Sequence, residues 1–192
     1  MLLSDTTENP DGRRGPSPMM FLSLGLGTAV ALTLIVVVSL LTGGGNSGLF
    51  SANALDGATV APISFPGFNG NTVRTPWASG HPTVVIFYAS WCQPCKEELP
   101  RVASYVSTHQ LGTVRFFGVD YNDNTASGQT FAAHAKVTFV SGIDATGSKT
   151  TTAFNLPGLP DTVFVNSNGV VSHYVIGPVS NAQLAAGITA LR

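Results

Sequence analysis

Cysteine is scarce in this chain of 192 residues, which has only Cys92 and Cys95, separated by Gln-Pro. This scarcity excludes the class of small domains held together by several disulfides. Any disulfide within one chain must join these two residues, and the loop that it closes is too short to restrict the unfolded chain much. A chemical role is therefore the better explanation for the pair.

Charge is scarce as well, because Asp, Glu, Lys and Arg make up 10% of the residues and the formal net charge is −1. A surface that binds phosphates needs an excess of Lys and Arg, so we expect no nucleic-acid partner. A structural zinc site usually needs four ligands. The sequence has no second cysteine pair and its four histidines are scattered, so we expect no metal and no cofactor. The histidines are His81, His109, His134 and His173.

One stretch, residues 19–41, has no charged residue at all. As a helix it would span roughly 35 Å, enough to cross the hydrocarbon core of a membrane. It is longer than the apolar region of a signal peptide, which is about 7 to 15 residues. The nearest Ala-x-Ala cleavage pattern, at residues 52–54, lies well past its end. We therefore predict a transmembrane anchor embedded in the lipid bilayer, and a cleaved signal peptide is the alternative.

Three further segments complete the predicted organisation. Residues 1–18 are polar and read as a disordered tail, residues 42–59 are rich in Gly, Ser and Asn and read as a flexible linker, and residues 60–192 form one soluble domain. Arg13 and Arg14 precede the anchor, and by the positive-inside rule they place the tail in the cytoplasm. The expected localisation is the cell membrane, with a single span and the domain on the outside.

The order of predicted elements indicates an α/β domain. Residues 83–88 form an apolar run typical of a buried strand, a helix follows Cys92, and residues 114–119 form the next strand. Two strands joined through a helix should be parallel. After one or two strands within 60–80 and this βαβ unit, we expect helices at 125–136, 148–154 and 181–191 and strands at 138–140, 162–165 and 170–176. This order outlines a thioredoxin-like fold, a central mixed sheet flanked by helices.

The cysteine pair falls where the first long strand gives way to a helix. Free backbone N–H groups at a helix N-terminus stabilise a thiolate, so Cys92 should be the reactive sulfur. Pro94 suits the first helical turn, where its missing N–H is not needed. Cys95, one turn further, is less exposed and can resolve the mixed disulfide that Cys92 forms with a substrate.

The segment Tyr88-Ala-Ser-Trp-Cys-Gln-Pro-Cys-Lys-Glu-Glu-Leu-Pro resembles the active site of the TlpA/ResA-type family. These are membrane-anchored, extracytoplasmic thioredoxin-like thiol–disulfide oxidoreductases, many of them reductases in cytochrome c maturation. The resemblance implies that Cys92 attacks and Cys95 resolves. It also implies that Leu159-Pro160 is the family's cis-proline segment, which together with Pro94 and a lid formed by Trp91 contacts the substrate.

Glu98 matches an acidic residue that this family carries one turn beyond the resolving cysteine. If it is buried, it can exchange a proton with Cys95; the alternative is a solvated glutamate beside Lys96 and Glu97. Cytosolic thioredoxins have a buried aspartate in the preceding strand, where this chain has Ile86. A proton relay of the cytosolic type is therefore unavailable in this chain, which makes Glu98 a more important candidate for proton exchange.

The expected activity is reduction of protein disulfides, with disulfide or dithiol proteins outside the membrane and possibly a membrane electron donor as partners. Oxidation of dithiols by the same residues stays open. Two other functions are a peroxiredoxin-like peroxidase, whose Pro-x-x-x-Thr-x-x-Cys pattern the sequence does not match, and a copper-handling protein. A Cys-x-x-Cys pair can bind Cu(I), but no histidine adjoins it here.

Overall fold

The computed structural model describes residues 55–192. The predicted tail, the predicted anchor and most of the predicted linker lie outside these residues. Within residues 55–192, no helix is long and apolar enough to cross a membrane. The elements are β1 (Ser64–Pro66), β2 (Thr72–Arg74), the 3-10 helix η1 (Pro76–Ser79), β3 (Thr83–Tyr88), α2 (Gln93–Thr108), β4 (Arg115–Tyr121), α3 (Thr125–His134), β5 (Val140–Asp144), α4 (Ser148–Phe154), β6 (Asp161–Val165), β7 (Val171–Ile176) and α5 (Asn181–Ala190).

The central sheet has five strands in the order β5-β4-β3-β6-β7. All six residues of β3 are buried, as their β-branched and aromatic side chains predict for the middle of a covered sheet. Strands β3 and β4 are parallel, which confirms the predicted βαβ unit, and β5 is parallel to β4. Strands β6 and β7 are antiparallel to their neighbours and form the predicted hairpin, closed by a bond of 2.9 Å from the Asn166 N–H to the Val170 carbonyl.

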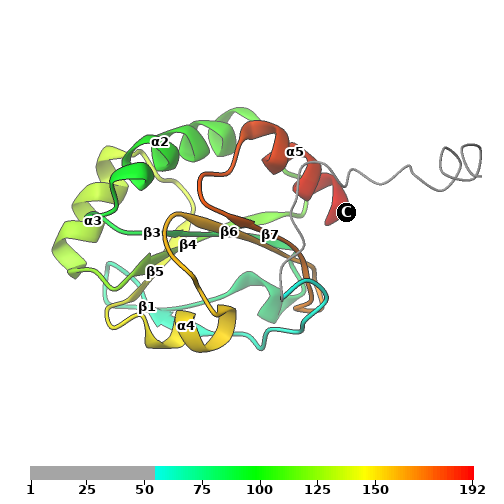
Figure 1. Cartoon of the computed structure of the whole chain (residues 1–192), viewed down its shortest axis with the longest axis horizontal. Helices are drawn as coiled ribbons and strands as arrows, with labels where there is room; N and C mark the ends of the chain where they lie inside the picture. The colour runs from blue at the N-terminus through cyan, green and yellow to red at the C-terminus, as the bar shows by residue number, and fades with distance from the viewer. Residues whose placement is uncertain (1–54) are drawn as a thin grey trace, which may run out of the picture. The chain divides into compact units, whose positions relative to one another are not determined.

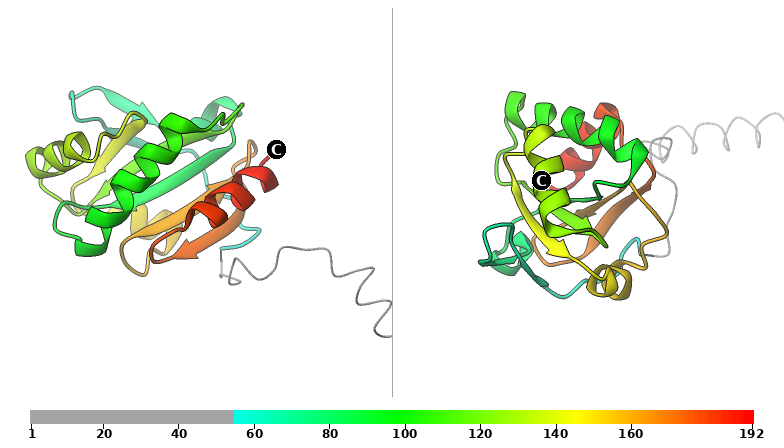
Figure 2. Two further views of the ribbon diagram at one scale, coloured as in Figure 1. Left: turned by 90° about the horizontal axis from the view of Figure 1, so that it is seen from above. Right: turned by 90° about the vertical axis from the view of Figure 1, so that its left-hand side faces the viewer.

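Helices cover both faces of the sheet, and Figure 1 shows α2, α3 and α5 on one side and α4 with β1 on the other. Two buried clusters correspond to these faces: one holds Cys92, Cys95 and the apolar residues of α2 and α5, and the other holds Phe154 of α4 and Trp77 of η1. Helices α2 and α5 lie side by side over the first face (Figure 2). The expected thioredoxin-like α/β fold is therefore confirmed.

The folded domain begins before the predicted boundary at residue 60. The Gly57 N–H donates to the Val171 carbonyl at 2.8 Å, the Val171 N–H donates to the Ala58 carbonyl at 2.9 Å, and Thr59 pairs with Val170. Strand β5 also differs from the expected strand at 138–140, because pairing with β4 starts only at Val140 and continues to Asp144. The sequence of β5 is rich in small and polar residues, which hid it from the sequence-based prediction.

Helix α5 packs closely against β6 at Gly187, and substitution of this glycine tests the packing. A Cβ atom at Gly187 would lie 2.2 Å from the Phe164 ring, whereas a Cβ atom at Gly158 would have nothing within 4 Å. We expect Gly187→Ala to lower the free energy of unfolding by about 1 to 2 kcal/mol, because overpacking outweighs the better helix propensity of alanine. Gly158→Ala should change it little. Urea unfolding measures both, and equal stabilities would contradict the close packing.

Candidate active site

A tight turn delivers Cys92 from the end of β3 to the start of α2. The Cys92 N–H donates to the Ala89 carbonyl at 3.2 Å, so Ser90 and Trp91 are the two central residues of the turn. Cys92 is the N-cap residue of α2, and its Sγ accepts a hydrogen bond of 3.2 Å from the Cys95 N–H. A sulfur held by a free backbone N–H at a helix N-terminus is in the position that stabilises a thiolate.

The two cysteines are joined in a disulfide, with their Cα atoms 5.3 Å apart. Cys92 keeps 4% of its surface exposed and Cys95 keeps none, so Cys92 is the sulfur that an external group can reach. Trp91 beside it is 56% exposed. Its Nε1–H donates to the Asn122 carbonyl at 3.0 Å, which fixes the ring next to the turn.

The proline segment lies at the same end of the sheet as the cysteines. The Leu159-Pro160 peptide bond is cis, as the family resemblance predicts. Pro160 directly precedes β6, whose first residue pairs with Phe87 of β3, and the cysteine turn follows β3. Leu159 packs against the cluster that contains both cysteines, whereas Pro94 is exposed in the first turn of α2.

Glu98 is buried, which excludes the alternative of a solvated side chain. It is 2% exposed, and its Oε1 accepts a hydrogen bond of 2.6 Å from the Val179 N–H. Burial raises the pKa of Glu98 to about 7, and the hydrogen bond from Val179 and the nearby Arg101 lower it by less. Its Oε2 has no hydrogen-bond partner among residues 55–192. A carboxyl group with this pKa can take up or release a proton near neutral pH.

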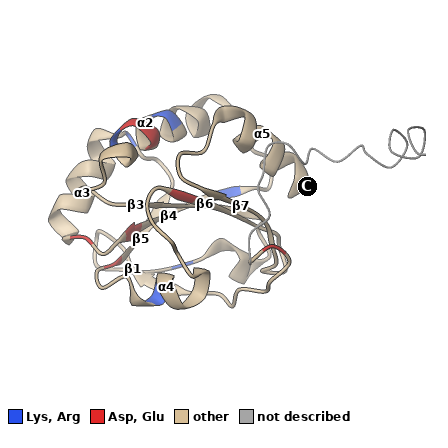
Figure 3. Ribbon diagram, in the orientation of Figure 1, with Lys and Arg blue, Asp and Glu red and all other residues tan. Residues whose placement is uncertain are grey.

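Asp161 is a second buried acid, and the sequence analysis missed it. Its carboxylate accepts hydrogen bonds of 2.9 Å from the Tyr174 hydroxyl and 2.9 Å from the Gly177 N–H. Burial raises the pKa of Asp161 to about 6. The charge of Asp161 also raises the pKa of Glu98, so these two acids are coupled. Figure 3 shows the acidic segment at the start of β6. The sequence signal that could have identified Asp161 is an acidic residue directly after Pro160, at the start of an otherwise apolar strand.

Asp120 and Asp123 were missed as well. Asp120, the last-but-one residue of β4, pairs with Tyr88 of β3 and is fully buried. Burial, and to a lesser extent the neighbouring Asp123, raise the pKa of Asp120 to about 8. Asp123 accepts hydrogen bonds from Ser90 in the cysteine turn. The sequence signal was their position: the carboxyl ends of parallel strands meet at one edge of a sheet, and Asp120 lies in the last two residues of β4 while Asp123 follows that strand.

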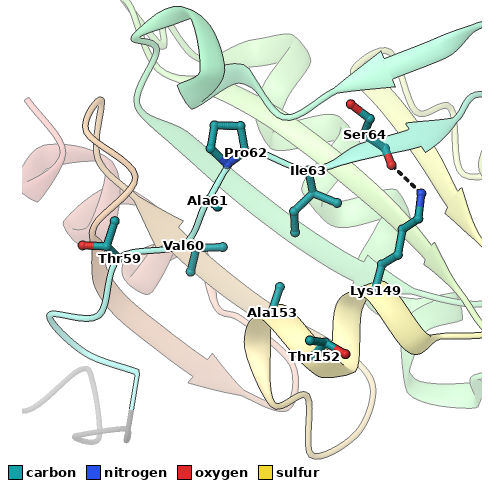
Figure 4. Close-up of a pocket in the computed structure, with 9 residues that line it drawn as sticks. All are labelled: Thr59, Val60, Ala61, Pro62, Ile63, Ser64, Lys149, Thr152 and Ala153. Atoms are coloured by element: carbon teal, nitrogen blue, oxygen red, sulfur yellow. Dashed lines mark hydrogen bonds between the residues drawn. The ribbon is translucent and has the colours of Figure 1, made fainter.

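Elsewhere in residues 55–192 the structure has surface hollows but no candidate metal site. No cluster of three or more His, Cys, Asp or Glu residues that could hold a metal occurs within residues 55–192. A hollow of about 560 Å³ lies on the face opposite the cysteines, between residues 59–64 and α4 (Figure 4). Its one charged side chain, Lys149, already donates to the Ser64 carbonyl at 2.7 Å.

Comparison with known protein families shows which family the domain belongs to. The AhpC/TSA family matches residues 57–174, more than half of the chain. The chain belongs to the AhpC/TSA family. The cysteine turn, Glu98 and Pro160 all lie within the matched AhpC/TSA region, as do the three aspartates described above.

Named relatives of this AhpC/TSA domain agree with the resemblance to ResA-type proteins. The chain is 29% identical over 108 residues to sporulation thiol-disulfide oxidoreductase A of Bacillus subtilis, covering 55% of this chain and 65% of that protein. It is 22% identical over 136 residues to thiol-disulfide oxidoreductase ResA of Geobacillus kaustophilus, covering 71% and 78%. The solved structure of Mycobacterium tuberculosis (MTB) dsbF in mixed oxidized and reduced forms has a TM-score of 0.60 and 29% identity, covering 68% of this chain and 95% of that one.

Proposed function

We propose that this chain is a thiol–disulfide oxidoreductase that reduces disulfides of protein substrates through Cys92 and Cys95. One observation carries the proposal: Cys92 caps α2, its sulfur accepts the Cys95 N–H, and Cys95 lies within disulfide distance. The relatives named above are thiol-disulfide oxidoreductases, which supports the same reaction here.

The proposed disulfide reduction takes place in two steps. In the reduced protein, the Cys92 thiolate attacks one sulfur of a substrate disulfide, and the other sulfur leaves as a thiolate. Cys95 then passes its proton to the Glu98 carboxylate and attacks the Cys92 sulfur, which releases the second substrate sulfur. Two electrons have moved to the substrate, and the Cys92–Cys95 disulfide must be reduced again by an external dithiol donor, for which a membrane protein is our candidate.

The groups around Cys92 are candidates for binding the substrate. The exposed Trp91 indole and the Leu159-Pro160 segment lie at the same end of the sheet as Cys92. We propose that an extended substrate segment lies along Leu159 and Pro160, beneath Trp91, with its disulfide at Cys92. Pro94, which is exposed in the first turn of α2, would contact the same substrate.

Reduction of insulin disulfides tests the proposal, with dithiothreitol as donor. The wild-type protein should speed the reaction, and its reduction potential against glutathione should lie near the roughly −270 mV of thioredoxin. A potential near roughly −120 mV, typical of a strong oxidant, would overturn the direction of exchange. Slow insulin reduction together with fast oxidation of Cys92 by hydrogen peroxide would indicate a peroxidase, and stoichiometric retention of copper would indicate a copper-handling protein.

We also propose that residues 19–41 anchor the domain outside the cell membrane, because this stretch has no charged residue and follows Arg13 and Arg14. The protein isolated from membranes should keep its full mass of 19.9 kDa. Cleavage after the Ala-x-Ala pattern at residues 52–54 would instead release the domain into the soluble fraction. Mass spectrometry of both fractions distinguishes these outcomes.

A further inference from the structure

The turn that presents Cys92 is tied to a loop 33 residues away in sequence. Asp123, in the loop between β4 and α3, accepts one hydrogen bond of 2.5 Å from the Ser90 N–H and another of 3.0 Å from the Ser90 hydroxyl. The adjacent Asn122 accepts the bond from the Trp91 indole. Both central residues of the cysteine turn are therefore held by the same short loop.

These bonds are not needed to cap α3. Asn124 performs that role, since its Oδ1 accepts from the Ala126 N–H at 3.0 Å and from the Ser127 N–H at 3.3 Å. Asp123 is thus free to direct its carboxylate at Ser90, while its Oδ1 also accepts from the Asn124 N–H at 2.7 Å. Ser90 and Asp123 are both half-buried, and a hydrogen bond is electrostatically stronger where it is partly shielded from water.

We infer that Asp123 is a positioning residue for the nucleophile: its carboxylate clamps Ser90 and so holds the Cys92 sulfur at the N-terminus of α2. The sulfur accepts a single backbone N–H, that of Cys95, and this bond depends on where the turn places residue 92. Ser90 is two residues before Cys92, and the turn bond between Cys92 and Ala89 spans it. Releasing Ser90 lets the turn move and weakens the stabilisation of the thiolate.

The test uses the Cys95→Ser background, in which Cys92 is the only thiol. The rate of alkylation by iodoacetamide is measured across pH. Asp123→Ala should move the midpoint of thiolate formation to higher pH and slow alkylation at pH 7 about tenfold, the effect of losing one good hydrogen bond to a charged group. Asp123→Asn, which can still accept from the Ser90 N–H, should recover most of the rate.

Two matched variants separate positioning from stability. Asn124→Ala removes the cap of α3 and should lower the urea midpoint without moving the alkylation profile of Cys92. Trp91→Phe keeps an aromatic ring but loses the bond to Asn122, and it should shift the profile in the same direction as Asp123→Ala by a smaller amount. Circular dichroism confirms that each variant is folded.

Two results would overturn the inference: an Asp123→Ala profile that overlays that of the unmodified background, or a midpoint shifted to lower pH, which would mean that only the charge of Asp123 acts on Cys92. The inference builds on the proposed role of Cys92, but alkylation needs no substrate. A wild-type protein that fails to reduce insulin would count against the proposed function and leave this experiment readable.

Discussion

Replacing Cys92 with Ser is expected to lower the rate of insulin-disulfide reduction by on the order of a thousandfold or more, because a hydroxyl group is not ionised at neutral pH and cannot attack a disulfide. Cys95→Ser should also stop turnover, but at a later step. Cys92 would still attack, and the mixed disulfide would persist because the resolving sulfur is missing.

The two variants form a matched pair, since each removes the Cys92–Cys95 bond and leaves one sulfur. Non-reducing gels of cells that express each variant should show covalent complexes with Cys95→Ser and none with Cys92→Ser. Mass spectrometry of the complexes would identify the substrates. Complexes formed equally by both variants would mean that Cys95 can attack by itself, against its complete burial.

Glu98→Gln is expected to slow the second chemical step about tenfold to a hundredfold at pH 7, because the amide keeps the bond from Val179 but cannot accept the proton of Cys95. The pKa of Glu98 is raised to about 7 by burial. The wild-type rate should therefore rise as pH increases through about 7, where Glu98 ionises, and this rise should be missing in Glu98→Gln.

A preformed mixed disulfide between Cys92 and a coloured thiol isolates that step, since release of the colour reports only the attack by Cys95. Glu97→Gln is the matched control: it has the same chemical change one residue away, on an exposed position of α2. If Glu98→Gln and Glu97→Gln release the thiol at the same rate, Glu98 takes no part in the proton transfer.

The same carboxyl group should make stability depend on pH. Because the pKa of Glu98 is raised from 4.5 to about 7 in the folded protein, the folded state holds a proton that the unfolded chain has lost between these values. The free energy of unfolding should therefore fall as pH rises through this window, by roughly 2 kcal/mol. Urea unfolding of the oxidised protein at pH 5 and pH 8 should show a smaller loss for Glu98→Gln than for wild type; equal losses would contradict the raised pKa.

Local patterns in the sequence were sufficient for most of the fold. Strand β3 and helix α4 have the predicted bounds, because a continuous β-branched run and a short helical segment express preferences of the chain itself. Strand β5 begins two residues later and ends four residues later than predicted, since its Ser, Gly and Asp residues form a strand only by pairing with β4.

The candidate site divides in the same way. The sequence alone was enough to propose the cysteine pair as the reaction centre, because two cysteines at this spacing behind a strand can be identified without any long-range contact. Whether Glu98 is buried depended on packing between α2 and the segment before α5, and its partner Val179 is 81 residues away. Only the tertiary structure brought Asp123 to Ser90 and Asp161 to Tyr174, because hydrogen bonds between separate strands and loops depend on how the sheet is assembled and leave no periodic pattern in the chain.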